Sequence, residues 1–306
     1  MSTPTREQIM AAADRIGSHI RRTPVLELEP DSRLAGVVLK LDMLQPTGTF
    51  KIRGAFNRLL SEPDPRRVVA ASGGNFARAI AHAAQTLGIA SDLFVPDSSP
   101  REKIEALAAY GSTVHIVAGV YPDALDASIE FAANVGGVFA HAYDQPAVVA
   151  GAGTCGMEIA SQVPDATTIL VAVGGGGLIG GIASWFRGDV DVVGVETEGT
   201  PTLHSAMASG RPVDIELSGL AVSSLGASRI GDIAWEAASQ WVTKSVLVGD
   251  DDLLAAQAWL WEETRLVIEP GSAAPLAALL SGAYRPSPSD RVVALACGAN
   301  TASRVT

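Results

Sequence analysis

Ile169-Leu-Val-Ala-Val173 leads directly into Gly174-Gly-Gly-Gly177, and a helical stretch of small and apolar residues opens at Leu178. The apolar run is typical of a strand buried on both faces of a parallel sheet. Glycines between a strand and a helix leave bare backbone N–H groups at the positive end of the helix dipole, where anions bind. The stretch therefore predicts an α/β fold with a phosphate at Gly174–Gly177. Tight strand–helix packing is the alternative reason for the glycines.

The alternation of short apolar runs and helical patterns extends over the rest of the chain. It indicates mostly parallel sheets with helices on both faces. Strands are predicted at Val37–Leu41, Val68–Ala71, Asp92–Val95, Thr113–Val117, Ile169–Val173, Val192–Val195 and Val292–Ala296. Helices are predicted at Phe76–Leu87, Arg101–Tyr110, Tyr121–Val135 and Leu253–Arg265.

Two loops are the best candidates for domain boundaries. The first is Ser61–Arg67, which contains two prolines, and the second is the turn Tyr143–Pro146. If these loops bracket one unit, residues 67–145 form a small inserted domain. Residues 1–66 and 146–306 then form one large domain that contains the predicted phosphate site.

Composition excludes several classes of partner. The chain has 306 residues, a formal net charge of -11 and a pI near 4.9, which argues against nucleic acid and against anionic membranes. Residues 169–186 carry no charge, but four consecutive glycines would break a lipid-facing helix. Two cysteines and a polar N-terminus indicate a reducing, cytoplasmic location. A small molecule is the expected partner.

The glycine stretch also fits a second cofactor. Gly175-x-Gly177-x-x-Gly180 matches the dinucleotide fingerprint, and Glu196 ends the next predicted strand about where a ribose-binding acid belongs. By itself this passage suggests an NAD-dependent dehydrogenase. The fingerprint lies past the midpoint of the chain, however, and it leaves several other segments unexplained.

Those segments are Pro46-Thr-Gly-Thr-Phe-Lys51-Ile-Arg-Gly-Ala55, Ala71-Ser-Gly-Gly-Asn75, Glu269-Pro-Gly-Ser-Ala-Ala274 and Leu295-Ala-Cys-Gly-Ala-Asn300. Together with Gly174–Gly177, and in the same order along nearly the whole chain, they resemble the serine/threonine dehydratase group of fold-type II pyridoxal-phosphate (PLP) enzymes. The resemblance implies two open, twisted α/β domains with mostly parallel sheets, the larger of which binds the cofactor. It also implies a homodimer with an amino-acid substrate.

The resemblance assigns roles to individual residues. Lys51 would form the Schiff base with the cofactor, and a lysine among apolar residues loses its proton more readily than an exposed one. Asn75 would hydrogen-bond the cofactor's 3-oxygen, and the turn Ser72-Gly73-Gly74, together with Asn75, would hold the substrate carboxylate. Further cofactor contacts are expected from Phe50, Gly174, Gly175, Gly176, Gly177, Leu178 and Cys297.

Cys297 stands where the family places a serine or a cysteine beside the pyridine nitrogen. A neutral thiol leaves that nitrogen unprotonated, which favours loss of a β-substituent over a long-lived carbanion. The implied reaction is β-elimination, a dehydration and deamination. Lys51 removes the Cα proton of a small hydroxy amino acid such as L-serine or L-threonine, and the cofactor phosphate protonates the departing hydroxyl. The products would be a 2-oxo acid and ammonia, so the enzyme would be an ammonia-lyase.

Three departures from the family pattern bear on this expectation. Racemases of the group carry a serine where this chain has Gly73, so little racemisation is expected. Phe76 replaces a usual histidine and puts the polarity of the substrate pocket in question. Some members bind a divalent cation at the carboxylate that Glu196 resembles, but the second acidic ligand is missing here, and one carboxylate rarely holds such an ion. The metal is left unassigned, with Glu196 as its first candidate ligand. Racemisation and β-replacement remain alternative reactions.

Overall fold

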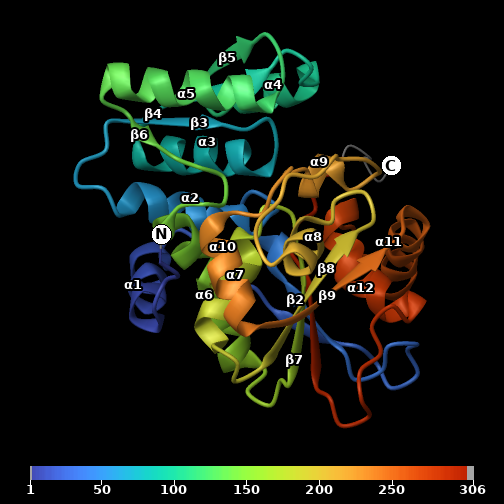
Figure 1. Cartoon of the computed structure of the whole chain (residues 1–306). Coiled ribbons are helices and arrows are strands. Elements are labelled where there is room, and N and C mark those ends of the chain that lie inside the picture. The colour runs from blue at the N-terminus through green and yellow to red at the C-terminus, as the bar shows by residue number, and fades with distance from the viewer. Residues whose placement is uncertain (1, 302–306) are drawn as a thin grey trace.

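The apolar run Ile169–Val173 contributes a middle strand, β7, to a six-stranded sheet (Figure 1). All five residues of β7 (Thr168–Ala172) are buried, which is what an unbroken apolar strand requires. The order is β1-β2-β10-β7-β8-β9, and every neighbouring pair is parallel except β1 and β2. The other strands are β1 (Val25–Glu27), β2 (Val38–Leu41), β8 (Asp191–Thr197), β9 (Val242–Val248) and β10 (Val292–Ala296).

A second sheet has four parallel strands in the order β5-β4-β3-β6. Its strands are β3 (Arg67–Ala71), β4 (Ala90–Pro96), β5 (Thr113–Val117) and β6 (Val138–Phe139). Alternate residues of β3 face opposite sides of this sheet. Val68 and Ala70 pack with α3 (Asn75–Leu87), whereas Val69 and Ala71 pack with α5 (Tyr121–Val135). Helices therefore cover both faces, as Figure 1 shows.

Helices also cover both faces of the larger sheet. In Figure 1, α6, α7 and α10 lie on one side of it, and α11 and α12 lie on the other. The helices of this part are α1 (Arg6–Ile16), α2 (Lys51–Leu60), α6 (Pro146–Gln162), α7 (Gly177–Phe186), α8 (Thr202–Ser209), α9 (Val222–Leu225), α10 (Asp232–Trp241), α11 (Asp250–Thr264) and α12 (Pro270–Ser281). A 3-10 turn, η1 (Asp42–Leu44), follows β2, and α4 (Arg101–Ala108) belongs to the smaller sheet. The predicted α/β class with mostly parallel sheets is confirmed.

The computed structural model describes residues 2–301. All four strands of the smaller sheet lie within the predicted insertion, residues 67–145. Helix α2 lies outside those bounds, yet Ile52, Phe56 and Leu59 join the core that packs on this sheet. The domain boundaries therefore stay a prediction, with α2 as the element that contacts both sides.

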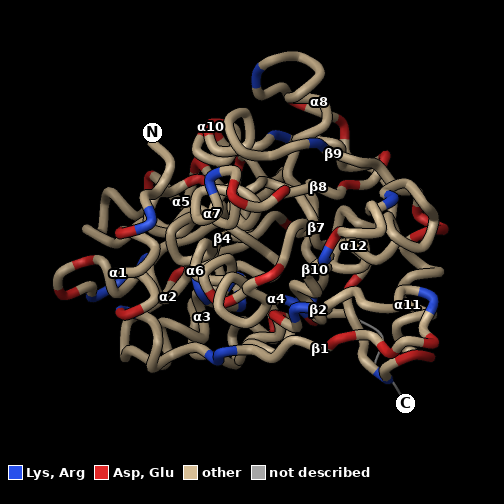
Figure 2. Tube along the Cα trace, turned by 90° about the horizontal axis from the view of Figure 1, so that it is seen from below, with Lys and Arg blue, Asp and Glu red and all other residues tan. Residues whose placement is uncertain are grey.

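Charged residues of both signs are interspersed along the chain, as Figure 2 shows. Among residues 2–301, no helix is both long and apolar enough to span a membrane. The uncharged stretch of residues 169–186 is instead divided between buried β7 and buried α7, with the glycines between them. Its hydrophobicity reflects burial inside the protein.

Candidate active site

The candidate site lies at the carboxyl ends of the central parallel strands. Gly174 follows β7, and Cys297 follows the neighbouring strand β10. Ligands of open α/β sheets bind at this edge, because successive strands there deliver loops to one place. One cavity is lined by all nine residues expected to contact the cofactor: Phe50, Lys51, Asn75, Gly174, Gly175, Gly176, Gly177, Leu178 and Cys297.

Lys51 begins α2, and its amine is enclosed. Its Nζ donates a hydrogen bond to the carbonyl oxygen of Ala142 at 2.9 Å. The same nitrogen lies 5.0 Å from the ring centroid of Phe50 and 6.0 Å from that of Phe76. Burial lowers the pKa of Lys51 to about 8, although Cys297 and Glu269 act in the opposite direction. A substantial fraction of this amine is therefore neutral near physiological pH.

Phe76 lies beside the lysine amine and does not line the cavity that contains Lys51. It is 2% exposed and is absent from the walls of the cavity that contains Lys51. The sequence had raised it as a question about substrate-pocket polarity. Its ring lies near the lysine amine, with 6.0 Å between Lys51 Nζ and the ring centroid.

Two features of the structure bear on why residues 174–177 are all glycine. The N–H groups of Gly174, Gly175 and Gly176 donate to no protein acceptor within residues 2–301, so they are available to an anion at the start of α7. Packing also demands glycine, because a Cβ at Gly175 would lie 2.4 Å from the ring of Tyr143. Gly176 has a φ of +85°, which side chains rarely adopt. Packing and backbone conformation therefore account for glycine at these two positions, and anion binding stays a prediction that the open N–H groups support.

Cys297 is a buried, neutral thiol. Burial raises the pKa of Cys297 to about 12. The Oγ of Ser272, in the first turn of α12, accepts hydrogen bonds from the N–H groups of Cys297 and Gly298 at 2.7 and 3.0 Å. This holds the cysteine in place without ionising it.

A chain of polar side chains joins the two halves of the site. Asn75 donates its Nδ2 hydrogen to Glu269 Oε1 at 2.7 Å and accepts one from Asn300 Nδ2 at 2.8 Å. Burial raises the pKa of Glu269 to about 7 against the opposing effect of Asn75. Glu269 also occupies the N-cap position of α12. Asn75 is therefore fixed in orientation, and a partly neutral carboxyl group lies beside it.

The turn expected to hold the substrate carboxylate lies between β3 and α3. The Oγ of Ser72 accepts a hydrogen bond from Gly74 N at 3.2 Å. Gly73 and Gly74 line a second cavity that shares Asn75 with the first. A Cβ at Gly73 would lie 3.2 Å from Ser99 Oγ. A side chain at this position is accordingly restricted by packing, and the chain has none there to act as an acid.

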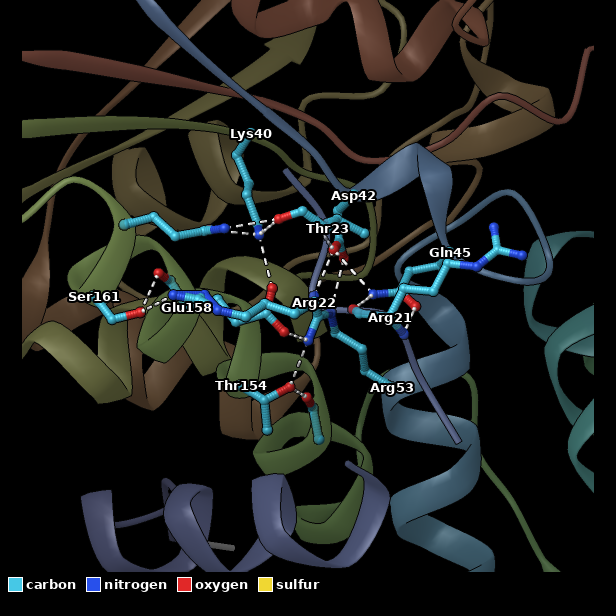
Figure 3. A network of polar contacts seen from close by, with 12 residues as sticks. Arg21, Arg22, Thr23, Lys40, Asp42, Gln45, Arg53, Thr154, Glu158 and Ser161 are labelled. Carbon is cyan, nitrogen blue, oxygen red and sulfur yellow. Dashed lines mark hydrogen bonds and ion pairs between the residues drawn. The ribbon is translucent and has the colours of Figure 1, made fainter. Parts of the chain in front are cut away.

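A buried ionic network supports the helix that carries Lys51 (Figure 3). Arg53, two residues further along α2, binds Asp42 with Nε and Nη2 at 2.9 and 2.6 Å. Its Nη1 also binds Glu158 at 2.8 Å and Thr154 at 3.1 Å. Lys40 Nζ reaches the other oxygen of Glu158 at 2.7 Å. The network ties α2 to β2, η1 and α6, and so fixes where Lys51 begins its helix.

The carboxylate of Glu196 is hydrogen-bonded to the start of α8 and to Ser245. Its carboxylate is fully buried and accepts hydrogen bonds from Leu203 N, His204 N and the hydroxyls of Thr202 and Ser245. Burial raises the pKa of Glu196, and these bonds oppose that rise. Within residues 2–301, no group of three His, Cys, Asp or Glu side chains is placed to hold a metal ion. The carboxylate caps the first turn of α8, and its role as a metal ligand stays a prediction.

Sequence reasoning overlooked three residues of the site. Tyr143 packs on the glycine stretch, and Asn300 orients Asn75. Arg78 lines the second cavity with its Nη1 3.0 Å from Asn300 Oδ1. Arg78 could have been found, because residues three apart share one face of a helix and Asn75 begins this helix. The other two are placed by tertiary contacts.

Comparison with known proteins is consistent with this geometry. A family model described as pyridoxal-phosphate dependent enzyme matches residues 16–298. An L-threonine ammonia-lyase of Geobacter sulfurreducens is 35% identical over 89% of this chain and 70% of its own length. The threonine deaminase of T.th. superposes with a TM-score of 0.92, 30% identity and coverage of 98% and 100%. Maize serine racemase also has a TM-score of 0.92, with 27% identity and coverage of 98% and 94%.

Proposed function

The chain belongs to the family of pyridoxal-phosphate dependent enzymes, and from this premise we propose that it dehydrates and deaminates a small hydroxy amino acid such as L-serine or L-threonine. It is an ammonia-lyase that releases a 2-oxo acid. One observation carries the proposal: the buried amine of Lys51, with its lowered pKa, faces the same cavity as the open N–H groups of the glycine stretch. A dinucleotide requires no such lysine, and Glu196 is buried beyond reach of a ribose.

The residues present fit the cofactor. Gly174–Gly177 would hold its phosphate, Lys51 its aldehyde, Asn75 its 3-oxygen and Cys297 its ring nitrogen. The neutral thiol of Cys297 suits an unprotonated ring nitrogen. When bound, the cofactor supplies an electron sink for the bond broken at Cα.

The protein's own residues supply the proton transfer. The neutral amine of Lys51 takes the Cα proton while the turn Ser72–Gly74 and Asn75 hold the carboxylate. The N–H groups of Gly73 and Asn75 are the ones that have no protein acceptor within residues 2–301, because those of Ser72 and Gly74 donate to Phe94 O and to Ser72 Oγ. Loss of that proton and of the β-hydroxyl removes one water, and hydrolysis of the remaining enamine gives the oxo acid and ammonia. Racemisation would need an acid on the opposite face, and Gly73 has no side chain. Elimination is therefore favoured over racemisation.

The proposal is tested with the purified protein, L-serine and L-threonine. We expect a visible absorption band from the bound cofactor and formation of 2-oxo acid. Lys51→Ala should abolish both, whereas Lys244→Ala, which removes an exposed lysine outside the cavity, should preserve both. Turnover by a folded Lys51→Ala protein would contradict the assignment of Lys51. Rapid formation of D-serine would favour the racemase alternative.

We further propose a cytoplasmic homodimer, following the family resemblance. Both cysteines, Cys155 and Cys297, are buried free thiols, as expected in a reducing compartment. An open surface groove is a candidate site for the partner chain, because it exposes apolar residues beside polar ones. Its lining includes Ala13, Ile20, Met157, Ala160 and Trp185 together with Arg22, Thr154, Glu158 and Ser161. Light scattering on a sizing column should give about twice 31.5 kDa. A mass of one chain would contradict the dimer.

A further inference from the structure

The second cavity extends from the carboxylate-binding turn toward the surface. Gly73, Gly74 and Asn75 form one wall, and Pro270 and Asn300 come from the part of the chain that forms the larger sheet. Asn75 belongs to this cavity and to the one that contains Lys51. A substrate whose carboxylate is held at Gly73 and Gly74 therefore has Lys51 on one side. The other residues of the second cavity lie on its other side.

Two cationic side chains stand in those walls. Arg78 comes from α3 and Lys103 from α4. The guanidinium of Arg78 bonds to the amide oxygen of Asn300, which leaves its charge uncompensated. Within residues 2–301 neither cation forms an ion pair, although Arg101 on the same helix as Lys103 pairs with Glu105. Among the described residues that line the cavity, none is acidic.

This local excess of positive charge contrasts with the whole chain, whose formal net charge is -11. Glu269 is a nearby carboxyl group, and it lines the first cavity, hydrogen-bonded to Asn75. Burial raises the pKa of Glu269 to about 7, and the charge of Lys103 lowers it, so this group neutralises the two cations incompletely. In the proposed function, the open N–H groups of Gly73 and Asn75 already bind the α-carboxylate of the substrate. Two further cations indicate a second anionic group on the substrate.

We propose that Arg78 and Lys103 bind the side-chain carboxylate of the substrate, and that the preferred substrate is a dicarboxylic hydroxy amino acid such as 3-hydroxyaspartate. This inference rests on the proposed dehydration at Lys51. The Cα–H and Cβ–O bonds break, one water leaves, and hydrolysis of the enamine gives oxaloacetate and ammonia. Atoms balance without an oxidant or a reductant.

The test measures kcat/KM of the holoenzyme for 3-hydroxyaspartate, in its erythro and threo forms, and for L-serine. Arg78→Gln removes the charge but keeps a donor for Asn300, and Lys103→Gln changes an exposed side chain. Each variant should lower the ratio of kcat/KM for 3-hydroxyaspartate to kcat/KM for L-serine by about 10- to 100-fold. This is the effect of losing one hydrogen bond to a charged group. Arg101→Gln, with the same charge change on α4 but outside the cavity, should leave the ratio unchanged.

A binding measurement gives a second readout. Succinate has two carboxylates and no amine, so it should bind the holoenzyme more tightly than butyrate by calorimetry, and Arg78→Gln should remove that difference. If Arg78→Gln does not fold, Lys103→Gln provides the same comparison.

The outcomes separate this inference from the proposed function. Turnover of L-serine or L-threonine without turnover of either form of 3-hydroxyaspartate would overturn the inference and leave the dehydratase function intact. An equal loss for both substrates in Arg78→Gln would overturn it too, because Arg78 would then only position Asn300. A colourless protein without turnover of any hydroxy amino acid would overturn both proposals.

Discussion

Replacement of Arg53 by methionine should destabilise the protein strongly. The change removes a fully buried charge and leaves the fully buried Asp42 without its two guanidinium hydrogen bonds. Burial alone raises the pKa of Asp42, but the charge and hydrogen bonds of Arg53 outweigh it, so the pKa lies below its usual value. Breaking one side of a buried ion pair costs about 3–5 kcal/mol. Dividing this loss by an unfolding entropy of about 2 cal/mol/K per residue, summed over 306 residues, predicts that Tm falls by about 5–8 °C.

The assay is thermal unfolding followed by circular dichroism, with Arg66→Met as the matched control. Arg66 pairs with Asp64 at the surface, where both side chains are largely exposed, and such a pair contributes about 0–1 kcal/mol. The double variant Arg53→Met/Asp42→Asn should recover part of the lost stability, because it no longer buries an unpaired carboxylate. Equal Tm values for Arg53→Met and Arg66→Met would show that the buried ion pair of Arg53 and Asp42 contributes no more than the exposed one.

Three further predictions concern protonation. The pKa of Lys51, lowered to about 8 by burial, means that cofactor uptake by the apo-protein should accelerate as pH rises through about 8; a rate independent of pH across that range would contradict it. The folded pKa of Glu269, about 7, lies above its usual 4.5, so its contribution to stability is present at low pH and is lost as pH rises through about 7. Glu269→Gln should therefore gain Tm relative to wild type between pH 5 and pH 8, and an unchanged difference would exclude the buried carboxylate as the cause. Burial raises the pKa of Cys297 to about 12 and also that of Cys155, so iodoacetamide should alkylate neither thiol in the native protein and both after denaturation, as counted by mass spectrometry.

Strong local patterns predicted their elements well. Thr113–Val117, Tyr121–Val135 and Val292–Ala296 have the predicted bounds in the structure. The strand Val242–Val248 was not predicted, because it lies at the sheet edge and exposes Thr243 and Lys244, which breaks the apolar pattern of a buried strand.

Some residues of the candidate site could be predicted from local sequence, and others could not. Lys51 and the glycine stretch are local motifs whose chemistry can be recognised from neighbouring residues. Arg78 and Asn300 are 222 residues apart in sequence and meet only through the fold. The environment of Glu196 could not be predicted locally either, because the groups that donate to its carboxylate come from α8 and from Ser245. Its role as a metal ligand stays a prediction.

Borohydride reduction of the holoenzyme, followed by peptide mapping, tests whether Lys51 binds the cofactor. The reduction turns the bond between the lysine and the cofactor into a stable pyridoxyl group. The chain has only four lysines, Lys40, Lys51, Lys103 and Lys244, so the labelled peptide identifies its residue without ambiguity. We predict one pyridoxyl group, on Lys51. A pyridoxyl group on any of the other three lysines, or on none, would contradict it.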